Sequence, residues 1–338
     1  MIGSMTLSQL VEPCEGEILN GDAEFDSVSI DTRKLGKGDL FVAISGQNFD
    51  GHDFLAEAES KGAVAAVVSR PSGSMLPQLV VEDTTKALGS VSGINRQKSA
   101  ARIIALTGSQ GKTTVKEMTG SVLSRSFPTL VTKGNLNNEI GAPLTLLRLE
   151  EQHRFAVIEL GANHPGEIAY SAAITSPDIA AITNAAHAHI EGFGSIDGVA
   201  ESKGEIIDNL KPDGTMVLNA DDQYFEAWCE RARPRRTVSF SVRSTEADYF
   251  AADLVRQKTG CFSFTLSANN NQRQVNLAVM GHHNVSNAVA SAALSIEAGA
   301  DLDQVVEGLE TFVPVDGRLA VVSGIRQSRI IDDTYNAS

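Results

Sequence analysis

A short glycine-containing loop between an apolar strand and a helix carries the clearest chemistry in the sequence. The loop consists of Thr107, Gly108, Ser109, Gln110, Gly111, Lys112, Thr113 and Thr114. Its glycines allow backbone N–H groups to turn around phosphate oxygens, and the helix that follows adds the positive end of its dipole. Lys112 would supply a cation for the outer phosphates, and Thr113 a hydroxyl for Mg²⁺. The pattern predicts a nucleotide phosphate-binding loop, with a plain glycine turn as the alternative.

This loop is shorter than the usual phosphate-binding pattern. Leu106 stands where that pattern has its first glycine, so Gly108 is the first glycine of this loop. No Gly-x-Ser-x-Gly elbow and no Cys–His pairing is evident in the sequence, so a covalent enzyme intermediate is not expected.

Apolar strands and helical stretches alternate around the loop, as in a parallel sheet with helices on both faces. The predicted elements are strand 102–106, helix 115–123, helix 140–147, strand 155–160, strand 179–182, helix 199–210 and strand 215–218. Alternating residues from Thr237 to Met280 predict antiparallel strands, and helices are predicted over 284–298 and 302–312. The fold class is therefore α/β, with a central parallel-sheet domain of the P-loop ATPase type that carries a small antiparallel portion.

A separate section precedes this domain. Strands are predicted over 28–30, 40–44, 63–68 and 79–81, and a helix over 53–61. After Pro314 and Gly317, a strand over 328–331 runs into Asp332 and reads as the opening of another α/β unit, or as a simple final strand. The predicted domains are therefore 1–98, 99–314 and 315–338, the last being a hinge and the start of a further domain that is truncated here.

Composition limits the classes of partner. Lys and Arg number 28 against 42 Asp and Glu, and the net charge of −14 argues against binding to nucleic acid or anionic membranes. The 3 cysteines are far apart and form no CxxC pair, so neither a zinc ribbon nor a disulfide framework is expected. The first residues lack the features of a signal peptide, and no apolar run is long enough to cross a bilayer. We expect a cytoplasmic protein without membrane insertion, and a monomer is compatible with its acidic surface.

Residues at the ends of two other strands of the same sheet are predicted to lie beside the loop. Glu159 ends the strand 155–160 at the carboxyl edge, where sites of α/β proteins gather, and a carboxylate there is a natural Mg²⁺ ligand. His187 and His189 follow the strand 179–182 and are candidates for a second metal position. The alternatives are an ordinary exposed glutamate and a hydrogen-bonded structural histidine.

Further short segments occur in a fixed order along the sequence together with these residues. They are Asp31 to Arg33, Gly38 to Ala43, Asp50 to Phe54, the loop itself, Lys133 to Gly141, Glu159 to Asn163, Ala188 to Ser195 and Gly281 to Asn287. With the loop, this series resembles the Mur ligases, the ATP-dependent amide ligases that build the peptidoglycan stem peptide. The resemblance covers essentially the whole chain and implies an N-terminal substrate domain, a central ATP-binding domain and a third, Rossmann-like domain.

The resemblance implies that ATP passes its γ-phosphoryl group to a substrate carboxylate. An amine then attacks the acyl phosphate and phosphate leaves, with one or two Mg²⁺ ions assisting. Ser109, Thr114, the pair Asn137 and Asn138, and the ending after Asp332 are nearest to the member that joins D-alanyl-D-alanine to UDP-N-acetylmuramoyl-tripeptide. The alternatives are the member that adds a diamino acid, a folylpolyglutamate synthetase, or a nucleotide-binding module without ligase activity.

The resemblance also assigns metal ligands and catalytic groups. The implied metal ligands are Thr113, Glu159, His189 and Lys203, and the implied catalytic residues are Lys112, Lys203, His189 and Asn138. Lys203 would carry a carbamate, formed when CO₂ adds to the neutral amine, or it is an exposed helix lysine paired with Glu201 or Glu205. Asn138 and Asn137 would donate to phosphate oxygens, or they belong to a turn.

Substrate contacts complete the expectations. For ATP, the resemblance points to Asn287 at the adenine, Arg318 at the phosphates and Asp332 at the ribose, in addition to the loop. The alternatives are that Asn284 simply caps the helix and that Arg318 is a solvated cation. Asp31, Thr32 and Arg33 resemble the loop for the uridine-diphosphate end, with a surface turn as the alternative.

Overall fold

The computed structural model describes residues 1–46, 49–187, 190–313, 317, 320–323, 325, 328–332 and 334. The described residues fall into two compact units. The first unit comprises residues 1–100 and 139–152, and the second comprises 101–138 and 153–338. The domain boundaries at residues 98 and 314 stay predictions.

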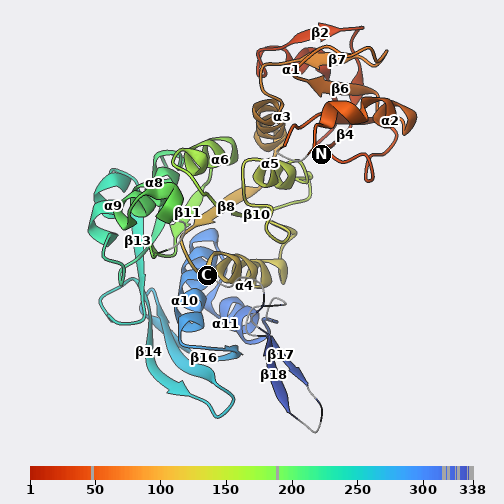
Figure 1. The fold of residues 1–338 in the computed structure, drawn as a ribbon. Coiled ribbons are helices and arrows are strands. Elements are labelled where there is room, and N and C mark those ends of the chain that lie inside the picture. The colour runs from red at the N-terminus through yellow and green to blue at the C-terminus, as the bar shows by residue number, and fades with distance from the viewer. Residues whose placement is uncertain are drawn as a thin grey trace. The chain divides into compact units, whose positions relative to one another are not determined.

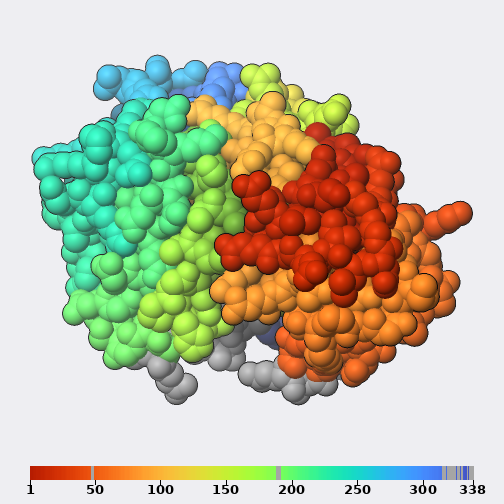
Figure 2. Space-filling model, turned by 90° about the horizontal axis from the view of Figure 1, so that it is seen from above, coloured from red at the N-terminus to blue at the C-terminus, as the bar shows by residue number. Residues whose placement is uncertain are grey.

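The first unit is built on a five-stranded sheet with the strand order β2-β7-β6-β5-β4. Its strands are β2 (Glu17–Leu19), β4 (Ser27–Ser29), β5 (Asp39–Val42), β6 (Ala65–Val68) and β7 (Gln78–Val80). The pairs from β4 to β7 are parallel, whereas β2 is antiparallel to β7 at one edge. A small antiparallel pair, β1 (Met5–Thr6) with β3 (Glu24–Phe25), lies outside this sheet. Figure 2 shows the red and orange atoms of residues in this unit as one continuous surface.

Strand β5 explains why the apolar run over 40–44 has no polar interruption. Alternate side chains of a strand point to opposite faces of the sheet. Leu40 and Val42 therefore pack with Leu88 in one core, while Phe41 packs with Leu55 in another. Because helices cover both faces, both sets of side chains must be apolar.

The helices of this unit are α1 (Leu7–Leu10), the 3₁₀ turn η1 (Gly51–Phe54), α2 (Leu55–Ser60), α3 (Thr84–Lys98) and α5 (Gly141–Leu146). Helix α5 returns to the unit from a later part of the chain and packs on α3. The buried Asn95 joins them, because its Nδ2 donates to the carbonyl of Leu146 at 2.8 Å and its Oδ1 accepts from the N–H of Ile2 at 2.8 Å.

The second unit is built on a nine-stranded sheet with the order β16-β15-β14-β13-β12-β11-β8-β10-β9. The strands are β8 (Arg102–Thr107), β9 (Thr129–Val131), β10 (Phe155–Glu159), β11 (Ile179–Ile182), β12 (Thr215–Asn219), β13 (Arg236–Ser241), β14 (Tyr249–Arg256), β15 (Cys261–Ala268) and β16 (Asn271–Met280). The pairs from β9 across to β14 are parallel, and β14, β15 and β16 are antiparallel. The predicted parallel sheet with a small antiparallel portion is confirmed.

The expected start of the antiparallel portion at Thr237 is wrong. Strand β13 pairs parallel with β12, Thr237 lying opposite Met216. The reason is the connection, because α9 (Phe225–Ala232) carries the chain from β12 back to the start of a neighbouring parallel strand. The antiparallel pairing begins one strand later, at β14.

Helices cover both faces of this sheet (Figure 1). Helices α4 (Lys112–Ser124), α10 (His283–Ala298) and α11 (Leu302–Glu310) pack against one another on one side. Helices α6 (Glu167–Thr175), α8 (Ile196–Asp208) and α9 form the other layer, and the short α7 (Ile190–Phe193) contacts α8. The apolar core holds Val115 and Met118 of α4 against Val157 of β10 and Val289 of α10.

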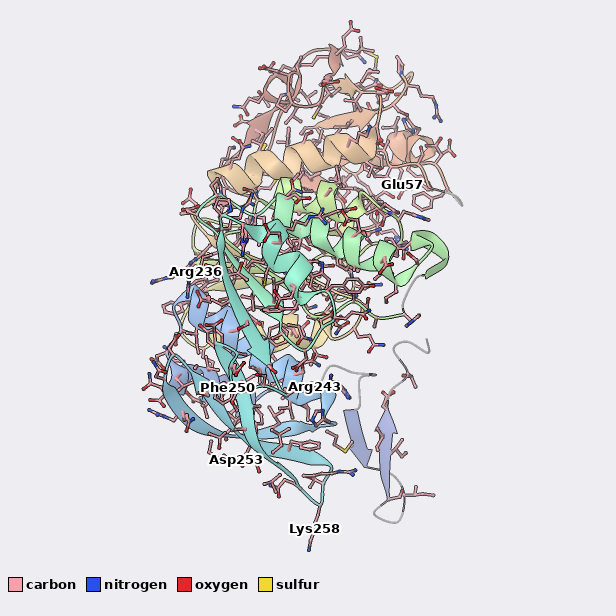
Figure 3. The ribbon with its side chains drawn as sticks, turned by 90° about the vertical axis from the view of Figure 1, so that its left-hand side faces the viewer. Glu57, Arg236, Arg243, Phe250, Asp253 and Lys258 are labelled. Atoms are coloured by element: carbon pink, nitrogen blue, oxygen red, sulfur yellow. The ribbon has the colours of Figure 1, made fainter. Side chains whose placement is uncertain are left out.

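Two hairpins extend from this unit. In Figure 3, β14 and β15 form an arm with Asp253 along it and Lys258 at its tip. A second hairpin consists of β17 (Ala320–Ser323) and β18 (Arg329–Asp332).

We predict that Asp83→Ala destabilises the first unit by about 1 kcal/mol, the usual value of a helix N-cap. The Asp83 carboxylate caps α3, accepting from the N–H groups of Thr85 at 2.8 Å and Lys86 at 3.1 Å. Chemical denaturation monitored by circular dichroism measures the change. Glu82→Ala is the control, because this neighbouring exposed carboxylate makes no cap. Equal unfolding free energies for the two variants would contradict the prediction.

Candidate active site

The predicted phosphate loop connects β8 directly to α4. Gly108 has φ 146° and Gly111, the residue before the helix, has φ 81°, and these are backbone conformations that other residues rarely adopt. Space is also restricted, because a Cβ on Gly108 would overlap Oγ1 of Thr183 and one on Gly111 would overlap Oδ1 of Asn287. The spacing of the two glycines therefore reflects both the backbone turn and the close packing of the loop.

Residues after β11 hold the loop from one side. The N–H of Ser109 donates to the carbonyl of Asn184 at 2.9 Å, and the N–H of Gln110 donates to Asn184 Oδ1 at 2.9 Å. Thr183 Oγ1 donates to the carbonyl of Gln110 at 2.6 Å, and the N–H of Ala186 donates to Ser109 Oγ at 2.9 Å. Thr183 and Asn184 were not predicted as site residues, although two polar residues directly after a buried strand are a signal for such a role.

Lys112 lies over the loop that precedes it. Its Nζ donates to the carbonyls of Gly108 at 2.6 Å and Ser109 at 3.2 Å. Because Lys112 is also the first residue of α4, its ammonium and the N–H groups of the first helical turn lie together, the arrangement that binds phosphate oxygens.

Glu159 lies at the end of β10, which is paired with β8, and the carboxylate is 1% exposed. Its Oε1 accepts from Asn137 Nδ2 at 2.7 Å and from Thr113 Oγ1 at 3.3 Å. Its Oε2 has no hydrogen-bond partner among the described residues. A buried carboxylate oxygen without a hydrogen bond, next to a hydroxyl, fits a hard cation such as Mg²⁺.

This carboxylate does not belong to a complete metal cage. No group of three or more His, Cys, Asp or Glu side chains that could hold a metal occurs in the part of the chain that the structure describes. Mg²⁺ commonly keeps several waters and is bound by one or two protein groups plus substrate phosphates, so the donor set is compatible with it.

Lys203 lies on α8 and is 2% exposed, so the alternative of an exposed helix lysine does not hold. Its Nζ is 5.2 Å from the centre of the Phe193 ring. Burial, followed by the positive charge of Lys112, lowers the pKa of Lys203 to about 8. A substantial fraction of the amine is therefore neutral near physiological pH.

Asn287 lies on α10 against the loop at Gly111, and its Nδ2 donates to Asn284 Oδ1 at 2.8 Å. Asn284 in turn donates to the carbonyl of Met280 at 2.7 Å. The cap position of α10 is His282, so the alternative in which Asn284 caps this helix does not hold.

The structure describes only some of the remaining predicted residues. His189 and Arg318 fall outside the described residues, and the neighbouring His187 is exposed. Asn138 is exposed, whereas Asn137 contacts Glu159. Asp332 accepts from the backbone and hydroxyl of Thr334 at the end of the β17–β18 hairpin.

In the first unit, Asp31 and Arg33 form a two-point ion pair, with Arg33 Nε and Nη2 each 2.9 Å from a carboxylate oxygen. The Arg33 side chain is 85% exposed. Its guanidinium lowers the pKa of Asp31 to about 2. Thr32 is buried, and its carbonyl accepts from Lys61 Nζ at 2.9 Å.

A buried parallel sheet, a glycine loop at its carboxyl edge and a helix that starts with lysine define a nucleotide-binding protein of the phosphate-loop class. Family models agree, because residues 106–295 match the Mur ligase middle domain and residues 24–92 match the Mur ligase family catalytic domain. The chain belongs to the Mur ligase family.

Individual relatives cover nearly the whole chain. The UDP-N-acetylmuramoyl-tripeptide–D-alanyl-D-alanine ligase of Escherichia coli (strain K12) is 46% identical over 335 residues, which are 99% of this chain and 74% of that protein. The enzyme of the same name from Bacillus subtilis (strain 168) is 34% identical over 98% of this chain and 72% of its own length.

Solved structures agree with the sequence relatives. A crystal structure of MurF from Acinetobacter baumannii has a TM-score of 0.94 at 38% identity, and the match covers all of this chain and 74% of that one. MurF from Thermotoga maritima in complex with ADP has a TM-score of 0.82 at 30% identity, covering 92% and 71%. A 2,6-diaminopimelate-adding ligase, at 22% identity and a TM-score of 0.64, shares the fold alone.

We predict that Gly108→Ala lowers the affinity for ATP about tenfold or more, because a strained backbone of this kind costs about 1–3 kcal/mol and the loop must shift to relieve it. Isothermal titration calorimetry on the full-length protein measures the affinity. Gly93→Ala is the matched control, since a Cβ there meets no atom within 4 Å. Unchanged ATP affinity in Gly108→Ala would show that the loop does not bind the nucleotide.

Proposed function

We propose that this protein is the ATP-dependent ligase that joins D-alanyl-D-alanine to UDP-N-acetylmuramoyl-tripeptide in peptidoglycan precursor synthesis. The single observation that carries the proposal is the identity of 46% over 99% of the chain with a relative of that name. The geometry supports it, because the site has a phosphate loop, a lysine and a buried carboxylate.

The loop residues would hold the phosphates of ATP while the γ-phosphoryl group passes to the tripeptide carboxylate. Lys112 and the N–H groups of the first turn of α4 would stabilise the negative charge that develops on the phosphate oxygens. The bond from the γ-phosphorus to the bridging oxygen breaks and one to the carboxylate oxygen forms. The amine of D-alanyl-D-alanine then attacks the acyl carbon, phosphate leaves and the amine loses a proton.

Mg²⁺ would be held by Glu159 Oε2 and the hydroxyl of Thr113, with His189 as a further ligand. When bound, the ion would neutralise charge on the phosphate oxygens. Asn137 supports this role of Glu159, since its amide occupies Oε1 and leaves Oε2 to face a cation. Asn138 stays the proposed donor to the acyl phosphate.

Lys203 is proposed to be carbamylated. A neutral amine is needed, because its lone pair attacks CO₂ and a proton is released as the carbamate forms. The lowered pKa of Lys203 and its burial against Phe193 support this modification, because burial outweighs the attraction of Glu205 and Glu167 for the charged amine. The carbamate would replace a repulsive ammonium beside Lys112 with an anionic oxygen ligand for a second Mg²⁺.

The remaining substrate contacts are also proposals. Asn287 would contact adenine, and Arg318 and Asp332 would contact the phosphates and ribose of ATP. Asp31, Thr32 and Arg33 would bind the uridine-diphosphate end, with Arg33 turning from Asp31 to a phosphate. No described helix is long and apolar enough to cross a membrane. We place the protein in the cytoplasm because ATP and the nucleotide-linked substrate are made there. A monomer is the proposed state, with which the net charge of −14 is compatible.

We expect full-length protein to release phosphate only when ATP, Mg²⁺, UDP-N-acetylmuramoyl-tripeptide and D-alanyl-D-alanine are all present. A coupled phosphate assay and mass spectrometry of the product measure the reaction. Lys112→Ala should lower kcat by about 100-fold or more, because a charge-stabilising group in the transition state is lost. Lys258→Ala, an exposed lysine at the tip of the arm in Figure 3, is the control.

Release that proceeds without D-alanyl-D-alanine, or only with a single diamino acid, would overturn the substrate assignment. Release that survives in Lys112→Ala at the wild-type rate would overturn the role of the loop.

We predict that Lys203→Arg lowers kcat by about 100-fold, since arginine keeps the charge but cannot form the carbamate ligand. Wild-type protein depleted of CO₂ should regain activity on addition of bicarbonate, and the variant should not respond. Because the neutral fraction of the Lys203 amine rises as pH approaches its pKa of about 8, activation at equal dissolved CO₂ should be more rapid at pH 8 than at pH 7. A wild-type rate indifferent to bicarbonate at both pH values would refute the carbamate.

A further inference from the structure

Helix α4 carries a second lysine one turn after Lys112 that the reaction described above does not use. The Lys116 side chain is completely buried. Its Nζ donates to the carbonyls of Thr132 at 2.8 Å and Gly134 at 3.2 Å, and is 2.8 Å from Glu117 Oε1. Burying an ammonium is unfavourable for folding unless it is paired and hydrogen-bonded. Packing alone therefore does not explain a lysine at this position.

The carboxylate of Glu159 lies farther from this ammonium than the carboxylate of Glu117 does. The Nζ of Lys116 is 3.8 Å from Glu159 Oε2, close enough for attraction between charges but too long for a hydrogen bond. The three protons of the ammonium have acceptors in Thr132, Gly134 and Glu117. Lys116 therefore compensates the charge of Glu159 and leaves Oε2 without a hydrogen bond.

The same lysine connects the segment after β9 to α4. Thr132 is itself joined to β10, because its Oγ1 accepts from the N–H of Glu159 at 3.1 Å and its N–H donates to the carbonyl of Val157 at 3.0 Å. A few residues later, Asn137 donates to Glu159 Oε1. Both ends of this short segment thus contact Glu159, and Lys116 holds its start.

We propose that Lys116 is a positioning residue, which counters the buried charge of Glu159 and holds the 132–137 segment so that Oε2 stays open to a divalent cation. The inference rests on the proposed role of Glu159 as a Mg²⁺ ligand. Lys116 itself touches neither nucleotide nor metal, and its effect passes through Glu159.

A double-mutant cycle on the metal-free, full-length protein tests the charge pairing. Lys116→Met leaves Glu159 buried without its counter-charge and should lower the unfolding temperature. Glu159→Gln removes one of the two carboxylates near Lys116 and leaves Glu117 as its counter-charge, so its loss should be smaller. The double variant should recover part of the loss, because removing both charges of a buried pair costs less than removing one. If the losses of unfolding temperature in the two single variants add up in the double variant, the proposal is overturned. It is also overturned if neither Lys116→Met nor the double variant folds.

Nucleotide binding provides the second readout. Calorimetric titration with ATP, in EDTA and then in Mg²⁺, gives the gain in affinity that Mg²⁺ confers. Lys116→Met should bind ATP in EDTA within about twofold of wild type but lose most of the Mg²⁺-dependent gain, a change of about tenfold. Lys258→Met, which removes a lysine charge at the exposed tip of the β14–β15 arm, should keep the gain.

The outcomes separate the two proposals. If Glu159→Gln keeps the Mg²⁺-dependent gain, the metal role of Glu159 fails. If Glu159→Gln loses the gain while Lys116→Met keeps it, only the positioning role of Lys116 fails. If Lys116→Met loses the same ATP affinity in EDTA as in Mg²⁺, Lys116 supports only the structure of the loop. This result would also overturn the inference.

Discussion

A carboxylate buried at the carboxyl edge of the central sheet is the constraint around which the neighbouring elements are arranged. Glu159 is 1% exposed, and an isolated charge at such a place would be strongly unfavourable. The surrounding structure compensates it with a hydroxyl from α4, an amide from the segment after β9 and a lysine ammonium at a longer distance. Because these groups come from separate elements, the carboxylate is tolerated only when α4, β10 and that segment are assembled together.

Strand register brings the rest of the site to the same place. Glu159 lies opposite Leu106 across β10 and β8, and Thr107 lies opposite Ile182 across β8 and β11. Since parallel strands end at one edge, the loop, the carboxylate and the residues after β11 meet there without a long connection. The close contact between Gly108 and Thr183 depends on this register, which explains why the loop needs a glycine rather than merely a flexible residue.

Sequence patterns identified the features that depend on local spacing. The glycine loop, most strands of the parallel sheet and the strand-end position of Glu159 follow from apolar runs and turn residues. Helix α3 was missed because Gly89 and Gly93 lower helix propensity, and its cap at Asp83 and its buried face compensate only in the fold. Strand β9, with three residues, and helices α6 and α9 were not identified either. For contacts between distant segments, such as Asn184 with the loop, the sequence shows only that polar residues follow a buried strand, and the partner is set by the strand register.

The two buried lysines of the second unit show why burial alone does not define a chemical role. The ammonium of Lys116 has oxygen acceptors for its protons and a carboxylate nearby, so its positive charge is stabilised where it is. The amine of Lys203 faces the Phe193 ring and feels the positive charge of Lys112, and the pKa of Lys203 is lowered to about 8. The first environment suits a permanent counter-charge, and the second suits an amine that reacts as a nucleophile with CO₂. The surroundings of each nitrogen, rather than its depth, therefore distinguish the lysine proposed to position Glu159 from the lysine proposed to be carbamylated.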